Sequence, residues 1–575
     1  MLPSDSLLGL VFALVMYAAS VIPSLMPRSW WWHAAASGVL MALGYIAGAV
    51  VELVGGILLD LTGAEVTAPE TTTHWFQIIV VAAFLLWFVR SVTISRLASI
   101  KAARLVHMRA ETWVAYILGT ITAALFAYLL VELVRSLLWS VVDVAELLER
   151  WLPNTVAVIA AVALVVGAVY LFATKIVVGG AVALFSRLAY RMNNQTARGI
   201  HQPTVPERSG SPDSVTTWES AGGQGRIFLG RGPHKEDIEA VTGRHAMEPI
   251  RVYAGMPKSG DLEESAAQVV EELRRTGAFD RRVLVVSIAT GSGWVDEWQV
   301  QPVEYLTGGD CATASMQYSY LFSSLNFITG LDLSVKASAA LFGAVHRAWS
   351  ELPESRRPYL YLCGESLGAY GSQSIFRDID EVLASVDGAL WVGTPGFTRM
   401  HRELTAARHK GSPEVAPVYD NGRHVRFAGA PEDLERDIYG RDLGPWGWPR
   451  VIYAQHASDP VVWWTTGMVW KEPDWMRERA GRDAWHGMEF TRIATFIQLI
   501  VDLPVAGTAP AGHGHTYHDE LIPMWQALLG PEALHWVDED MRRRIAAAIS
   551  ANLALSERGG IKDTLEERRA RRKAS

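Results

Sequence analysis

Long apolar stretches are concentrated in the first third of the chain. A helix needs about 20 predominantly apolar residues to cross the hydrocarbon core of a bilayer. Five stretches, the first of them the shortest, reach or approach this length, over residues 7–22, 33–59, 75–92, 113–131 and 155–178. Tryptophans lie at their edges, as in the aromatic belts of membrane proteins: Trp30, Trp31, Trp32, Trp75, Trp113 and Trp151. This pattern predicts a membrane domain of about five helices over residues 1–192.

Charges in the connecting loops predict how this domain is oriented. The connection after the second stretch has acidic residues and no Lys or Arg, whereas basic residues also follow the fifth stretch. Loops rich in Lys and Arg stay on the cytoplasmic side, so the part of the chain that follows is expected in the cytoplasm and the N-terminus outside. The connection after the third stretch is the most basic, with Arg90, Arg96, Lys101, Arg104 and Arg109.

Beyond residue 249 the apolar residues follow a different, alternating pattern. Helical spacing at 262–275 and 333–349 alternates with short apolar runs that are typical of buried strands, at 250–254, 283–288, 359–363, 388–392 and 451–454. This alternation predicts an α/β domain over residues 244–550, with a mostly parallel sheet covered on both faces. Residues 193–243, rich in Gly, Ser, Pro and charge, are expected to form a linker, and residues 551–575 a basic tail.

Composition narrows the classes of protein. The net charge of −8 argues against a nucleic-acid partner. Only two cysteines are present, Cys311 and Cys363, which excludes a disulfide scaffold. Cys363 lies in a predicted strand, so we expect a buried structural thiol there.

A Gly-x-Ser-x-Gly sequence follows the apolar run at 359–363. It consists of Gly364, Ser366 and Gly368 with one residue between each pair, and an apparent helix comes after it. A strand, a sharp turn and a helix form the context in which this sequence is a nucleophile elbow, with the serine hydroxyl exposed above the sheet. The alternative is a glycine-rich turn with an idle serine. The context favours Ser366 as a nucleophile, with the Leu367 N–H where an oxyanion would form.

A serine nucleophile needs a base and an acid that orients the base. In hydrolases of this architecture both follow the serine along the chain. Asp459 comes directly after the predicted strand 451–454, at the edge where parallel strands end, and is the expected acid. Asp387 is the rival, but it precedes its strand and should lie at the opposite edge.

The base is expected in a glycine-rich loop near the C-terminus. His513 and His515 both lie there, and we favour His515, with His513 as the alternative and His456 as a supporting residue. No thiolate or well-spaced set of carboxylates accompanies these histidines, so neither a metal nor another cofactor is predicted.

Two further stretches have candidate roles at such a site. The glycine-rich loop after strand 283–288 could bring a second amide to the oxyanion, from Thr290 or Gly291. Trp463 and Trp464 begin an aromatic stretch that could form core, line an acyl pocket or dip into the bilayer. The basic residues 568–573 suit an anionic membrane surface or form a solvated tail.

These features together resemble the actinobacterial membrane-anchored α/β-hydrolase family, which has an N-terminal multi-span domain and a C-terminal catalytic domain. Residues 393–395 depart from a more proline-rich version of the family pattern, which leaves the role of that loop open. The resemblance implies a serine hydrolase and no particular substrate. It rests on residues 225–226, 249–253, 290–294, 309–310, 317–320, 364–368, 455–456, 458–460, 463–464 and 512–515.

Two functions compete at this stage. The first is a membrane-bound serine esterase, lipase or acyltransferase that acts on a lipid-like or acyl ester, with the bilayer as its other partner. The second is a lipid-handling or transport protein whose hydrolase-fold domain is regulatory or non-catalytic. The order Ser366, Asp459, His515 along the chain favours the first. The sequence does not determine the oligomeric state.

Overall fold

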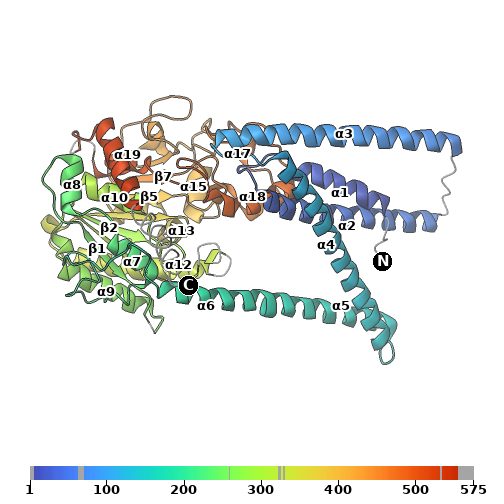
Figure 1. Cartoon of the computed structure of the whole chain (residues 1–575), viewed down its shortest axis with the longest axis horizontal. Coiled ribbons are helices and arrows are strands. Elements are labelled where there is room, and N and C mark those ends of the chain that lie inside the picture. Colours follow the sequence, from blue (N-terminus) through green and yellow to red (C-terminus); the bar gives the residue numbers. More distant parts are fainter. Residues whose placement is uncertain are drawn as a thin grey trace, which may run out of the picture. The chain divides into compact units, whose positions relative to one another are not determined.

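The computed structural model describes residues 6–62, 70–257, 259–321, 326–327, 330–530 and 534–554. The chain divides into two compact units (Figure 1). The first, here called the helical unit, comprises Met1–Ala181 and Trp464–Pro510, and the second, the sheet unit, comprises Val182–Trp463 and Ala511–Ser575. The basic residues 568–573 lie outside the described residues.

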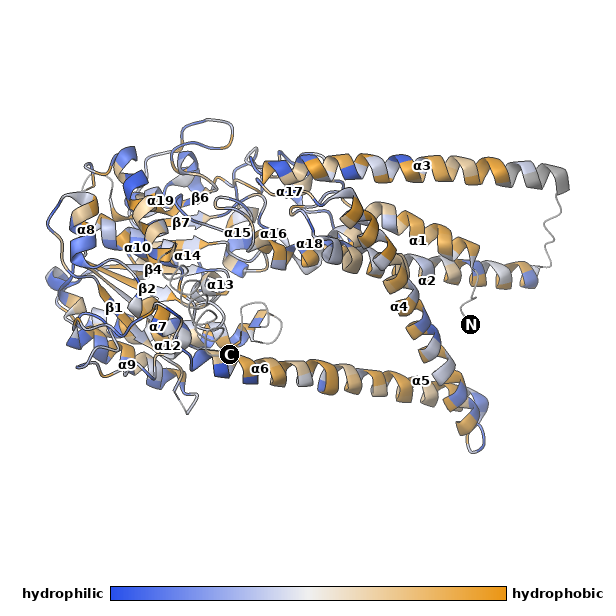
Figure 2. Ribbon diagram, viewed as in Figure 1, coloured by the Kyte–Doolittle hydropathy of each residue, from blue (hydrophilic) through white to orange (hydrophobic). Residues whose placement is uncertain are grey.

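The helical unit contains long apolar helices in its first part. Figure 2 shows apolar residues along most of their length. Four runs are long and apolar enough to cross a membrane, whereas α1, with 14 residues, is shorter. The four fit a multi-span membrane protein. The helices are α1 (Leu7–Ser20), α2 (Trp30–Thr62), α3 (Glu70–Leu105), α4 (Trp113–Leu148) and α5 (Asn154–Leu171), which continues through a π-helical turn (Phe172–Val178) into α6 (Gly179–Asn193).

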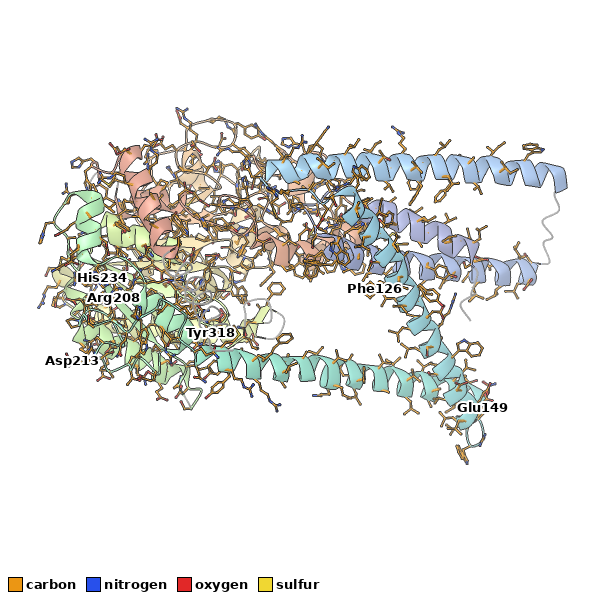
Figure 3. All side chains as sticks on the ribbon, in the orientation of Figure 1. Phe126, Glu149, Arg208, Asp213, His234 and Tyr318 are labelled. Atoms are coloured by element: carbon orange, nitrogen blue, oxygen red, sulfur yellow. The ribbon has the colours of Figure 1, made fainter. Side chains whose placement is uncertain are left out.

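Small residues allow these helices to approach closely. A Cβ atom at Gly48 of α2 would lie 2.4 Å from the carbonyl oxygen of Leu8 in α1. A Cβ at Gly38 would lie 2.6 Å from the ring of Phe126 in α4, labelled in Figure 3. Helices in membranes associate through such close backbone packing, because lipid supplies no hydrophobic drive between them.

A segment from far along the chain, residues 464–510, belongs to the helical unit. It contains α17 (Asp474–Arg477) and α18 (Arg492–Ala506). In α18 the Gln498 amide donates to the carbonyl oxygens of Ser20 (2.8 Å) and Ile22 (2.9 Å), which follow α1 or end it. The buried Asp502 accepts from Arg28 at 2.8 Å. A buried carboxylate needs such a partner, which ties this segment to the helices. The sequence pattern did not predict this assignment.

The sheet unit is built on seven parallel strands. Their spatial order is β1-β3-β2-β4-β5-β7-β6, and every pairing is parallel. Two strands were not predicted: β3 consists mainly of small and polar residues, and Arg426 interrupts β6, so neither forms an apolar run. The strands are β1 (Ile250–Ala254), β2 (Val283–Ile288), β3 (Cys311–Met316), β4 (Tyr359–Glu365), β5 (Gly388–Val392), β6 (Val425–Ala428) and β7 (Arg450–Ala454).

Both faces of the sheet are covered. Alternate residues of β2 enter two different cores: Leu284 and Val286 one of them, Val283 and Val285 the other. This is the reason for the unbroken apolar run in the sequence. One core includes α9 (Leu262–Arg275) and α12 (Leu331–Ser350), and the other includes α10 (Glu297–Leu306) and α19 (Leu521–Leu529). Further helices are α13 (Leu367–Ser374), α14 (Ile379–Ser385), α15 (Arg399–Ala406) and α16 (Pro460–Trp463).

The region expected to be a linker, residues 193–243, is folded against the sheet unit. It contains α7 (Gly222–Gly230) and α8 (Lys235–Thr242). Arg208, labelled in Figure 3, is buried and donates to the carbonyl oxygens of Arg231 (2.6 Å) and Pro233 (2.7 Å). It also lies 3.2 Å from the Glu248 carboxylate. Polar composition suggested a linker, but the segment folds into helices and Arg208 makes these hydrogen bonds inside the fold.

Candidate active site

Ser366 stands between β4 and α13 in a strained backbone conformation. Its φ of 53° and ψ of −118° are rarely adopted by residues other than glycine. The Ser366 N–H donates to the Val392 carbonyl at 2.9 Å, which holds the turn against β5. A Cβ at Gly364 would lie 2.6 Å from the carbonyl carbon of Gly368, and a Cβ at Gly368 would lie 2.2 Å from the Ile288 carbonyl oxygen. The two glycines are therefore required sterically for the elbow.

Asp459 and His515 lie together although 56 residues separate them. His515 Nδ1 is 2.6 Å from Asp459 Oδ2, and this oxygen also accepts from the Tyr517 hydroxyl at 2.9 Å. The other oxygen accepts the Val461 N–H at 2.9 Å. Asp459 is fully buried, and His515 is mostly buried. These bonds fix the imidazole with Nδ1–H towards the acid, while Nε2 has no hydrogen-bond partner in the described part of the chain.

The loop that carries His515 is shaped by its own residues and by β5. His513 pairs with Thr516 in an isolated bridge, and the Gly514 N–H donates to the Ser458 hydroxyl at 2.7 Å. A Cβ at Gly393, which follows β5 with a φ of 53°, would lie 2.4 Å from His515 Cε1. Gly393 therefore leaves the space that the imidazole ring occupies, which explains a loop whose role the sequence left open.

His456 packs against the loop that carries His515. Its Nδ1 lies 2.9 Å from the Gly514 carbonyl oxygen, and its ring stacks on Tyr517 with 4.1 Å between centroids. Its Nε2 lies 3.1 Å from the Glu520 carboxylate. Both nitrogens thus face acceptors. These contacts fit the supporting place predicted for His456.

Asp387, the alternative candidate for the acid, and Cys363 of β4 both lie in structural surroundings. Asp387 accepts the Leu360 N–H at 2.7 Å, next to the start of β5 and away from the strand ends near Ser366. Cys363 is buried in β4, and burial raises the pKa of its thiol to about 12.

Sequence reasoning missed a pair of buried acids beside His515. Glu365 immediately precedes Ser366, and one of its oxygens lies 3.9 Å from His515 Nε2. Gln299 donates to the other at 3.4 Å. Burial raises the pKa of Asp296 to about 7, and burial and the Asp296 charge raise the pKa of Glu365 well above its ordinary value. Both shifts favour the protonated forms of the two carboxyls. The signal was a glutamate at the second position of Gly-x-Ser-x-Gly.

The candidate N–H donors to the oxyanion differ in whether they already have an acceptor. Leu367 opens α13, and the first N–H groups of a helix have no acceptor within it. The Thr290 N–H, however, donates to the Trp294 carbonyl at 2.9 Å, and the Gly291 N–H donates to the Tyr318 hydroxyl at 3.0 Å. Neither amide is open to an oxyanion in this conformation, because Thr290 is bonded within the loop after β2 and Gly291 is bonded to Tyr318 from the segment after β3.

The two tryptophans that were expected at a substrate pocket belong to different units. Trp463 is buried, and its indole N–H donates to the His456 carbonyl at 3.1 Å. Trp463 therefore supports the loop that carries Asp459, whereas the sequence had suggested that it could line a substrate pocket. Trp464 belongs to the helical unit, where its ring lies 5.4 Å from that of Phe496 in α18. Among the residues described, no group of three or more His, Cys, Asp or Glu could hold a metal ion.

Family models match both parts of the chain. Residues 250–544 match the model described as the alpha/beta-hydrolase family, and residues 21–233 match the model of that family's N-terminus. The first match includes all seven strands together with Ser366, Asp459 and His515. No curated protein matches the chain, and no solved structure does. Because the first match covers just over half of its length, the chain belongs to this alpha/beta-hydrolase family.

Proposed function

We propose that this protein is a membrane-bound serine hydrolase that cleaves an acyl ester through Ser366, His515 and Asp459. The observation that carries the proposal is the 2.6 Å contact between His515 Nδ1 and Asp459, which leaves Nε2 open. The strained turn at Ser366 supports it, because strain of this kind is kept where function needs it.

The reaction would proceed in two halves. Ser366 Oγ attacks the carbonyl carbon of the ester while His515 Nε2 takes the hydroxyl proton. The imidazolium then gives this proton to the leaving alcohol, and an acyl-enzyme remains. A water, or a second alcohol in an acyl transfer, repeats these steps and releases the acyl group. Hydrolysis and acyl transfer therefore differ only in the acceptor.

Three groups would support the charge changes. Asp459 holds His515 in the tautomer with Nδ1–H and stabilises the imidazolium. The Leu367 N–H faces the developing oxyanion, a contribution of roughly 3 kcal/mol for one donor. Glu365 stays neutral because its pKa is raised, so it does not compete with Asp459 for the imidazolium.

The substrate class follows from the attachment of this domain to membrane helices. Four long apolar helices fit a multi-span membrane protein, so the catalytic residues work near a lipid surface. A lipid-like or acyl ester reaches such a site by diffusion within the bilayer. We propose this class of substrate over a small soluble ester.

The nucleophile is tested by labelling the purified full-length protein with a fluorophosphonate. Ser366→Ala should abolish labelling and lower turnover about a million-fold, because removing a triad nucleophile has that effect. Ser374→Ala is the matched control, since Ser374 lies in the same helix and its hydroxyl donates only to the Tyr370 carbonyl. Wild-type labelling of Ser366→Ala would refute the assignment.

We also propose that the sheet unit lies in the cytoplasm, because the C-terminal part of α3 and the end of α6 are basic. A C-terminal alkaline phosphatase fusion should be inactive, and a C-terminal green fluorescent protein fusion should be bright. The opposite pair of results would place the active site in the cell envelope.

A further inference from the structure

The helical unit contains a small cavity of about 60 Å³. It lies where the loop after α1, the start of α2, the last part of α3 and the start of α4 meet. Apolar residues of the loop form part of its wall, including Val21, Ile22 and Pro23. Three cationic or imidazole side chains and one carboxylate complete it: Arg28, His33, Arg96 and Glu111. None of these belongs to the active site described above.

Arg96 is the central charge of this cavity. Only 4% of its surface is exposed, and its guanidinium lies over the rings of Trp113 (5.3 Å) and Tyr116 (4.9 Å). One terminal nitrogen donates to the Glu111 carbonyl oxygen. In the described part of the chain, Nε has no acceptor. A buried guanidinium with an unused N–H is costly unless something else accepts that hydrogen.

His33 also lines this cavity and has a nitrogen without a partner among the described residues. The residue is 7% exposed, and its ring stacks on Tyr116 with 4.9 Å between centroids. Its Nδ1 lies 3.4 Å from the Ser37 hydroxyl. Its Nε2 is buried and has no hydrogen-bond partner among the described residues. Two nitrogens from different helices therefore lack partners at one cavity.

The remaining charges at the cavity already have partners in the protein. Arg28 donates to Asp502 at 2.8 Å and to the Ser20 carbonyl at 3.2 Å. The Glu111 carboxylate accepts the Trp30 N–H at the start of α2, at 3.2 Å. Arg96 forms no ion pair of its own among the described residues, although the Glu111 carboxylate lines the same cavity.

The size of the cavity suits a small tetrahedral group. One water-sized group takes about 10–15 Å³ of such volume, so 60 Å³ holds roughly four to six, and a phosphate has five heavy atoms. A second cavity of about 270 Å³ adjoins it, with Ile22 and Pro23 in both walls. Trp87 and Ile94 of α3 line the second together with the charged Arg90 and Glu489. A phosphate with an apolar chain attached could occupy both.

We propose that this cavity binds a phosphate group, held by Arg96 and His33. Arginine matches phosphate oxygens with its planar set of N–H donors, and a tetrahedral group offers enough oxygens for the histidine as well. Such a group is present in an anionic phospholipid and in free phosphate. The site would make the helices a lipid-responsive part of the protein in addition to an anchor.

The test is a thermal unfolding titration of the full-length protein in dodecyl maltoside micelles, in a Ser366→Ala background so that no ester is cleaved. Phosphatidylglycerol, phosphatidylcholine and inorganic phosphate are added separately. A ligand that binds the folded state raises the unfolding midpoint. A rise with phosphatidylglycerol and none with inorganic phosphate supports a lipid source, and a rise with inorganic phosphate supports a soluble one.

Variants separate this site from general charge attraction. Arg96→Gln should weaken the apparent affinity roughly tenfold to a hundredfold, as expected for losing a hydrogen bond to a charged group. His33→Gln provides a second variant should Arg96→Gln fail to fold. Arg104→Gln, an exposed arginine of the same helix, is the matched control and should leave the affinity unchanged. The proposal is overturned if neither phosphatidylglycerol nor inorganic phosphate raises the unfolding midpoint of the wild type. It is also overturned if Arg104→Gln weakens binding as much as Arg96→Gln.

Discussion

Two buried arginines, one from each unit, differ in how far their N–H groups are satisfied. In the sheet unit, Arg251 of β1 is fully buried, and all of its N–H groups have acceptors on Glu297, Glu304 and the Phe228 carbonyl. In the helical unit, Arg96 is nearly as buried, yet its Nε has no acceptor among the described residues. A saturated buried charge can only stabilise the fold, whereas an unsaturated one retains capacity to bind.

Histidines repeat this contrast within the sheet unit. Both ring nitrogens of His456 face acceptors, the Gly514 carbonyl and the Glu520 carboxylate, so this ring supports the loop that carries His515. His515 has one nitrogen on Asp459 and the other open. The comparison teaches that burial alone does not distinguish a structural group from a functional one. The unused donor or acceptor does.

The largest effect is expected at the open nitrogen of the sheet unit. His515→Ala should lower turnover of a p-nitrophenyl ester about a million-fold, as for Ser366→Ala, because the base is lost. Asp459→Asn should lower it about ten thousand-fold, because the imidazole is held in the wrong tautomer. His513→Ala is the matched control and should be milder. Loss of activity in His513→Ala with activity kept in His515→Ala would move the base to His513 and break the comparison.

The saturated arginine should govern stability instead. Arg251→Met leaves Glu297 and Glu304 buried without their partner, and we expect it to lower the stability of the sheet unit by about 3–5 kcal/mol. Arg274→Met removes an exposed pair with Glu351 and should change it by at most about 1 kcal/mol. Thermal unfolding followed by tryptophan fluorescence measures both. Equal midpoints for the two variants would contradict the role given to Arg251.

The smallest effect is a pH dependence from Glu365 and Asp296. Burial raises the pKa of both, that of Asp296 to about 7. Between pH about 4 and 7 the folded state therefore binds protons that the unfolded chain has released, so this pair makes stability fall as pH rises. Glu365→Gln should reduce this slope by up to about 1.4 kcal/mol per pH unit for one proton.

Unfolding midpoints of wild type and Glu365→Gln across this pH range measure the difference. Glu381→Gln is a suitable control, because that carboxylate is on the exposed side of α14 and pairs with Arg377. Parallel pH profiles for wild type and Glu365→Gln would show that Glu365 does not hold a proton in this range.

Local patterns in the sequence were sufficient for features that depend on neighbouring residues. The apolar runs identified the membrane helices and five of the seven strands, since hydrophobic periodicity is a property of a short window. The elbow at Ser366 was recognisable because two glycines and a preceding strand determine its geometry locally. The position of Asp459 after a strand was inferred from the rule that parallel strands end at one edge.

Only the tertiary structure decided features that join distant segments. It paired His515 with Asp459, showed that Gly393 makes room for the ring, and gave the Thr290 and Gly291 amides acceptors on Trp294 and Tyr318. It assigned residues 464–510 to the helical unit and folded residues 193–243 against the sheet. Whether a buried polar group is saturated depends on partners tens or hundreds of residues away, as with Arg28 and Asp502. No local pattern records that, because hydrogen bonds are satisfied in space and not along the chain.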